Sequence, residues 1–213
     1  MLSCIIFSWD DKKPTTLAVN YLTDEFSFWT RGGVQQAAVF ISRVVVARTE
    51  VGKIQSITPE GGREFDPDTV LTDFVCHVMV KGNKLALAMV TSKNYPRRVA
   101  FEVMQDLAKK WEEVHPNWPE YAMQRVDKQM EFPYMVKVCK SYEDPAKSDN
   151  ILKIQNQLED TKDIMLQNIE SILARGESIN ELVEKTDDLE ASSKIFFNNA
   201  DKLNSCWGRC SIL

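Results

Sequence analysis

The sequence predicts an α+β protein: an antiparallel five-stranded sheet with helices, followed by one long C-terminal coiled-coil helix. Three observations lead to this fold class. In roughly the first 135 residues, short apolar runs and turn residues alternate in the order ββαβββαα. Two segments there have the apolar spacing of helices that pack on a sheet. From residue 146 to 203 there is no proline and only one glycine, and apolar side chains recur every three or four residues.

The strands are indicated by apolar runs that end at turn residues. The turn at 10–14, with two aspartates and Pro14, joins the first two runs into a hairpin. Gly82 and Asn83 form a favourable tight turn for a second hairpin. The five strands are expected over residues 2–7, 16–21, 52–58, 74–80 and 84–91.

The first helix, expected over residues 33–49, has two apolar faces. One face fits a sheet and consists of Val34, Ala37, Ala38, Ile41 and Val45. The second face consists of Phe40, Val44 and Ala47 and lies well round the helix from the first. One sheet cannot cover both, so something else should dock on the second face. Spacing alone leaves open whether this is a separate segment or the domain's own second helix or a loop.

The remaining elements of this half are less regular. Phe26, Phe28 and Trp29 are expected in a short connection before the first helix, and residues 59–69 in a loop. Further helices are expected over residues 96–113 and 134–142, with a proline-containing connection between them. A polar linker over 144–150 then leads into the long helix.

Composition excludes several classes of function. The chain has 213 residues, 44% of them apolar, which is enough for a sizeable core. A net charge of -5 argues against nucleic acid as a partner. An odd number of cysteines, five, and the lack of a signal peptide indicate a reducing, cytosolic setting. No apolar run approaches the roughly 18 residues of a membrane-spanning helix.

We find no catalytic or metal-binding pattern and expect no cofactor. His77 and His115 lack a suitable set of neighbours, so both are interpreted as structural. Cys4, Cys76 and Cys139 lie in apolar stretches and are expected to be packed thiols. Paired carboxylates such as Asp187 and Asp188 are expected on a solvated outer face of the long helix.

The C-terminal half contains sixteen positions spaced alternately by three and four residues, of which eleven are apolar. Such a repeat predicts a seam that is buried against other helices in a left-handed coiled coil. The positions are Ile151, Ile154, Leu158, Thr161, Met165, Asn168, Ile172, Arg175, Ile179, Leu182, Thr186, Leu189, Ser193, Phe196, Ala200 and Leu203.

Arg175 interrupts this seam near its centre. A buried guanidinium without acceptors costs several kcal/mol, so partner helices should bring side-chain carbonyls to its layer. The alternative is an arginine that reaches out of a loose coiled coil to water.

Residues 173–177, with seven seam positions before Arg175 and eight after it, resemble the SNARE motif of R-SNAREs. This resemblance implies that Arg175 meets one glutamine from each of three Q-SNARE helices in a parallel four-helix bundle. Zippering of that bundle would drive the fusion of vesicle membranes.

The last four residues, Cys210 to Leu213, fit the C-a-a-X prenylation motif, with leucine favouring geranylgeranyl. A chance cysteine at this position is the alternative. One lipid anchors a protein only marginally, so Cys206 is the natural second site, for palmitoyl or a second prenyl group. Only two basic residues lie nearby, too few for a polybasic patch.

Nearly the whole chain is similar to the lipid-anchored longin R-SNAREs, a branch of the synaptobrevin homologues. The SNARE motif carries most of the similarity, together with residues 26–34 and 95–101 of the first half. The family usually ends with two adjacent cysteines, whereas Trp207, Gly208 and Arg209 separate Cys206 from Cys210 here. That departure puts the modification of Cys206 in doubt.

The resemblance implies a longin domain over 1–143, a linker over 144–150, a SNARE motif over 151–205 and a lipidation tail over 206–213. It also implies that the longin domain folds back on the SNARE motif and shelters the lipid, with Phe40, Val44 and Ala47 as the expected contact. A cytosolic pool would then cycle to the cytosolic face of Golgi, endosomal, vacuolar or lysosomal and vesicle membranes. Two other classes remain open: a lipid-anchored coiled-coil tether, and an enzyme that acylates its own Cys206.

Overall fold

A six-stranded sheet forms the centre of the structure, in the order β2-β1-β5-β4-β3-β6. The computed structural model describes residues 1–24, 26–58, 74–143, 164, 166–191 and 193–194. Neighbours among the first five strands pair antiparallel, which confirms the predicted sheet. The sixth strand was not predicted and comes from the C-terminal half, where it pairs parallel with β3. The strands are β1 Ser3–Ser8, β2 Thr15–Tyr21, β3 Ile54–Thr58, β4 Phe74–Val80, β5 Leu85–Ser92 and β6 Leu166–Asn168.

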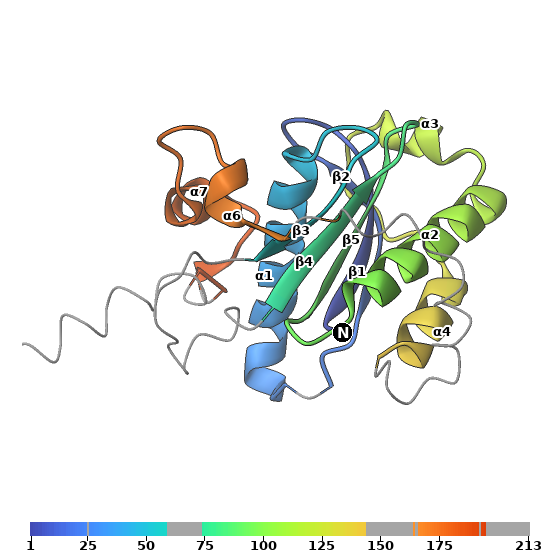
Figure 1. The fold of residues 1–213 in the computed structure, drawn as a ribbon, viewed down its shortest axis with the longest axis horizontal. Coiled ribbons are helices and arrows are strands. Elements are labelled where there is room, and N and C mark those ends of the chain that lie inside the picture. Colours follow the sequence, from blue (N-terminus) through green and yellow to red (C-terminus); the bar gives the residue numbers. More distant parts are fainter. Residues whose placement is uncertain (25, 59–73, 144–163, 165, 192, 195–213) are drawn as a thin grey trace, which may run out of the picture.

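Helices cover both faces of this sheet (Figure 1). The longest helix, α1, lies on one face, and α2 and α4 lie on the other. The helices are α1 Phe28–Ala47, α2 Arg97–Val114, α3 Trp118–Ala122, α4 Pro133–Ser141, α6 Ile169–Ile172 and α7 Ile179–Lys185. The predicted order ββαβββαα therefore holds, with the short α3 added in the connection before α4.

Two differences from the sequence prediction concern the start of α1 and the connection before α4. Phe28 and Trp29, expected in a connection, form the first turn of α1 and are 82% and 90% exposed. The short α3 has Pro119 in its first turn, where a missing N–H removes no helical hydrogen bond. Proline therefore begins a helix in this connection, although its presence favoured an irregular chain.

Alternation along the strands divides the core into two clusters. In β4, Cys76, Val78 and Val80 point toward α1, whereas Met79 points toward α2. The α2 cluster is centred on Trp111, which is fully buried and stacks edge-on against Phe132. The α1 cluster also contains side chains from the C-terminal half, so α1 and the sheet alone do not complete it.

The prediction of one continuous helix over 151–203 is wrong for the described residues. Between residues 166 and 194 the chain forms β6, α6, a turn and α7 instead (orange in Figure 1). Residues 151–163, 165, 192 and 195–203 lie outside the described part. Within that part, no helix is long and apolar enough to cross a membrane.

His77 occupies the middle of the sheet and is 1% exposed. Its Nδ1 lies 2.8 Å from Ser56 Oγ on β3, and its Nε2 lies 3.0 Å from Thr91 Oγ1 on β5. Both ring nitrogens are thus paired, as expected for a structural histidine. Burial, with a smaller contribution from the charge of Arg97, lowers the pKa of His77 to about 4.

We expect His77 to make folding pH-dependent between pH 6.5 and 4. The unfolded chain binds a proton at His77 in this window and the folded chain does not, so the stabilisation is complete above pH 6.5 and lost as pH falls toward 4. The pKa lowered to about 4 corresponds to about 3 kcal/mol of unfolding free energy. In His77→Asn, which keeps polar atoms but does not titrate, this part of the pH slope measured by urea unfolding should disappear. An unchanged slope would exclude His77 as its source.

Candidate functional site: the docked C-terminal segment

Residues 166–191, 193 and 194, here called the docked segment, lie against α1 and the β3 edge of the sheet (Figure 1). Ile169, Val183 and Leu189 are at most 5% exposed and belong to the same cluster as Phe40 and Val44 of α1. Each buried aliphatic side chain of this size contributes about 1.5–3 kcal/mol. Partly buried residues that extend the contact are Ile172, Leu173, Ile179 and Leu182.

The face of α1 expected to receive a docking element is buried in this structure. Phe40, Val44 and Ala47 are 6%, 8% and 9% exposed. Phe40 and Val44 share a cluster with the docked segment. The second apolar face of α1 is therefore closed by the C-terminal half of the chain, one of the two alternatives that spacing left open.

Backbone pairing fixes the start of the docked segment. Ser56, Ile57 and Thr58 of β3 pair with Leu166, Gln167 and Asn168 of β6. Thr58 Oγ1 also donates a hydrogen bond to the carbonyl oxygen of Gln167 at 3.2 Å. The segment therefore extends the sheet before it turns onto α1.

Arg43 of α1 holds the middle of the contact. Its side chain is only 10% exposed and donates to Asp188 at 2.6 Å and to Asp127 at 2.6 Å. It also donates to Thr16 Oγ1 at 3.0 Å. A buried guanidinium needs such partners, because it would otherwise be destabilising by several kcal/mol. Arg43 thus joins α1, β2, the connection before α4 and the docked segment.

Asp188 was expected on a solvated outer face of the long helix; it follows the end of α7 instead, where it remains exposed but pairs with Arg43. Its side chain is 35% exposed and also approaches Lys13 at 3.4 Å. Burial alone would raise the pKa of Asp188, but the attraction and hydrogen bond of Arg43 outweigh it and lower the pKa. Asp188 is therefore held as a carboxylate in the contact.

Gln36 and Arg48 make further polar contacts with the docked segment. Gln36 Oε1 accepts hydrogen bonds from Glu190 N at 3.0 Å and from Ser193 Oγ at 2.8 Å. Arg48 Nη2 donates to Glu177 Oε2 at 2.9 Å, and this hydrogen bond lowers the pKa of Glu177. Polar contacts therefore line α1 from Gln36 through Arg43 to Arg48.

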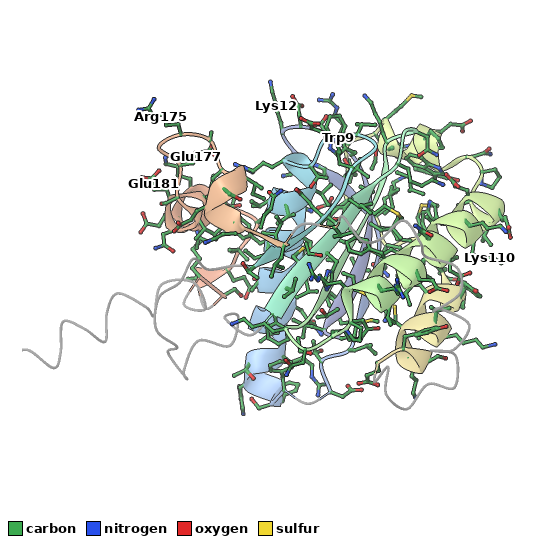
Figure 2. The ribbon with its side chains drawn as sticks, in the orientation of Figure 1. Trp9, Lys12, Lys110, Arg175, Glu177 and Glu181 are labelled. Atoms are coloured by element: carbon green, nitrogen blue, oxygen red, sulfur yellow. The ribbon has the colours of Figure 1, made fainter. Side chains whose placement is uncertain are left out.

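Arg175 lies in the turn between α6 and α7 and is exposed. Figure 2 shows its side chain at the outer rim of the molecule, away from the sheet. The docked segment thus leaves the central arginine of the seam in contact with solvent.

The other seam positions divide between described and undescribed parts of the chain. Leu189 and Ser193 are buried, whereas Ile172, Ile179 and Leu182 are only partly covered. Eight seam positions and both tail cysteines lie outside the described residues: Ile151, Ile154, Leu158, Thr161, Met165, Phe196, Ala200, Leu203, Cys206 and Cys210.

Polar seam residues form the local bonds that shape the docked segment. The side chain of Asn168 accepts from Glu170 N and caps α6. Thr186 Oγ1 accepts from Asp188 N after the end of α7, and Ser193 bonds to Gln36. The polar residues that would weaken an apolar seam therefore form hydrogen bonds in the docked segment.

Sequence reasoning missed Ile169 and Val183, which are buried but lie one residue beyond seam positions. It also missed the start of α7, where Ser178 accepts from Glu181 N. The pattern Ser-x-x-Glu at these positions is a recognisable helix start and was a usable signal. Among the described residues, no group of three or more His, Cys, Asp or Glu side chains is placed to hold a metal ion.

Val183→Asp should release the docked segment, because a carboxylate would replace a fully buried apolar side chain in an apolar cluster, without a hydrogen-bond donor or a cation to compensate its charge. Hydrogen–deuterium exchange of residues 166–191 should rise by at least a hundredfold, which corresponds to about 3 kcal/mol or more. Asn180→Asp, on the exposed side of the same helix, is the matched control and should leave exchange unchanged. Continued protection of the segment in Val183→Asp would contradict the buried contact.

Two domain families match the chain in succession. Residues 25–138 match the regulated-SNARE-like longin domain, and residues 150–212 match synaptobrevin. The boundary between the two matches falls between α4 and the docked segment.

Relatives match this chain over most of their own length. The chain is 32% identical to the synaptobrevin homolog YKT6 of Yarrowia lipolytica, over 91% of this chain and 92% of that protein. It is 30% identical to the homolog of the same name in Saccharomyces cerevisiae, over 85% of each. It is 30% identical to the VAMP-like protein YKT61 of Arabidopsis thaliana, over 88% of this chain and 85% of that protein. The chain therefore belongs to the YKT6-type synaptobrevin homologues, the longin R-SNAREs of vesicle trafficking.

Proposed function

We propose that this protein drives vesicle–membrane fusion by forming a parallel four-helix bundle with three Q-SNARE helices, with Arg175 in its central layer. The observation that carries the proposal is the unbroken run of sixteen seam positions around Arg175 in a synaptobrevin-family segment. The exposure of Arg175 in the docked segment supports it, because the guanidinium is available to glutamine carbonyls.

Assembly would gain free energy from surface that docking leaves uncovered. Ile172, Ile179 and Leu182 retain exposed area in the docked segment and would lose it in a bundle. Burial yields about 25 cal/mol for each Å² of apolar surface, summed over the seam. This free energy would do the work of drawing two membranes together.

We also propose that docking regulates assembly. Leu189 and Ser193 are covered by α1 in the docked segment, and a bundle needs the same side chains in its layers. The two arrangements therefore exclude each other. In this scheme residues 1–143 are the regulatory longin domain, 144–150 the linker, 151–205 the fusion motif and 206–213 the tail.

The membrane anchor in this proposal is covalent lipid, a prenyl group on Cys210 and palmitoyl or a second prenyl group on Cys206. The docked longin domain would shelter the lipid and maintain a cytosolic pool. Release would send the protein to the cytosolic face of Golgi, endosomal, vacuolar or lysosomal and vesicle membranes. No catalytic step is required.

The self-acylating enzyme is disfavoured by the state of the described thiols. Cys4, Cys76 and Cys139 are at most 2% exposed. Burial raises the pKa of Cys76 to about 12, and a hydrogen bond with Cys139 followed by burial raises that of Cys4. A thiol is nucleophilic only as the thiolate, so these groups are poor candidates. The coiled-coil tether differs from the R-SNARE in not requiring Arg175.

Arg175→Glu should block assembly with three purified Q-type SNARE helices, since a carboxylate cannot donate to glutamine carbonyls and its burial would be uncompensated. Circular dichroism and gel filtration of the mixture should show no four-helix complex. Because Arg175 is exposed in the docked segment, hydrogen exchange of the free protein should not change. A normal four-helix complex from this variant would refute the central-layer role of Arg175, whereas the absence of a complex from the wild type as well would favour the tether.

Phe40→Glu should release the docked segment from the longin side, because Phe40 is 6% exposed in the shared cluster. Proteolysis of residues 146–203 should accelerate at least tenfold, and lipidated protein should move from the soluble to the membrane fraction. Phe40→Leu, which stays apolar, is the control. Faster proteolysis without redistribution would show that docking does not govern the lipid.

A further inference from the structure

The turn between α6 and α7 depends on a backbone conformation that only glycine adopts freely. Gly176 has φ +89°, and the backbone N–H of Glu177 donates to the carbonyl oxygen of Ala174 at 2.9 Å. Arg175 and Gly176 are therefore the central residues of a tight turn whose second central residue has positive φ. The Glu177 carboxylate also accepts from Ala174 N at 3.1 Å and from Arg48, which fixes the turn to the end of α1.

A lack of room for a side chain does not explain why residue 176 is a glycine. Apart from Gly176 and its two chain neighbours, no atom of the described residues lies within 4 Å of the place that a Cβ would occupy at residue 176. An alanine here would therefore meet no obstacle and would be opposed only by its preference for negative φ. This makes the position a clean test of backbone conformation, free of packing effects.

The same glycine is unfavourable in a continuous helix. It directly follows the central Arg175, where a four-helix bundle needs uninterrupted helix, and glycine is the poorest helix former after proline. It is the only glycine between residues 146 and 203. A segment built only for the bundle would gain from alanine at this position.

We infer that Gly176 is the conformational determinant that lets the docked segment turn back on the longin domain, at the expense of the fusion-active helix. The neighbouring Asn168 and Ser178 caps act in the same direction, because each begins a short helix within the span of the long one. The role of Gly176 in docking is inferred from the structure of the free chain. Its opposing role in the bundle rests on the proposed function.

The test compares L-alanine and D-alanine at position 176 in the full chain, the latter introduced by chemical ligation. L-Alanine opposes positive φ and favours right-handed helix, and D-alanine has the opposite preferences. In Gly176→Ala, hydrogen exchange of residues 166–191 should rise about tenfold. Assembly with three purified Q-type SNARE helices should be favoured by a further factor of about five. D-Alanine should slow exchange and impair assembly.

Asn180→Ala is the matched control. Residue 180 is helical and exposed in α7, and it would also be helical in the bundle, so alanine should stabilise both states alike. For Asn180→Ala, the ratio of docked to assembled protein should stay within about twofold of the wild-type ratio.

Different results would overturn the role of Gly176 and the proposed four-helix assembly. Wild-type exchange in Gly176→Ala, or the same response to both alanine enantiomers, would overturn the role of Gly176. Tenfold faster exchange in Gly176→Ala with no complex from any variant would leave that role intact and instead refute the four-helix assembly.

Discussion

The structure depends on one constraint: α1 is apolar around most of its circumference and must be covered on two sides. The sheet covers Val34, Ala38 and Val45, and the docked segment covers the side that contains Phe40 and Val44. Leaving the second side in water would expose a continuous apolar patch, which soluble proteins avoid unless a partner uses it. Helix α1 therefore needs a segment that covers its second apolar side, and the C-terminal half of the chain supplies that segment.

Polar groups determine where that cover lies. Apolar contacts alone would allow the docked segment to shift along α1. The buried guanidinium of Arg43 forms hydrogen bonds only with partners in a few positions. Arg43 fixes Asp188, and Gln36 and Arg48 fix the segment on either side of it. Ile169 and Val183 belong to this arrangement without being seam positions. Docking and the proposed four-helix assembly would thus use overlapping but distinct side chains of one segment.

The sheet and its helices could be predicted because each strand or helix shows its own periodicity and is bounded by turn residues such as Gly82 and Asn83. The two faces of α1 could be predicted for the same reason. The fold of the docked segment could not, because a spacing of three and four residues reports the face a helix would present to other helices. It does not report whether those helices are present. Local signals at Asn168, Gly176 and Ser178 oppose the long helix, and their weight became clear only beside α1. Arg43 was hidden from sequence reasoning because its aspartates lie far away in the chain.

The pairing of β6 with β3 has a consequence for the lifetime of the released protein. If the segment were released, as proposed, the backbone donors and acceptors of Ser56–Thr58 that pair with β6 would lose their partners. An open strand edge is a template for other extended chains, including those of neighbouring molecules. Release without a prompt replacement would thus favour self-association as well as fusion. In the docked fold, β6 covers this edge of β3 and protects it from such pairing.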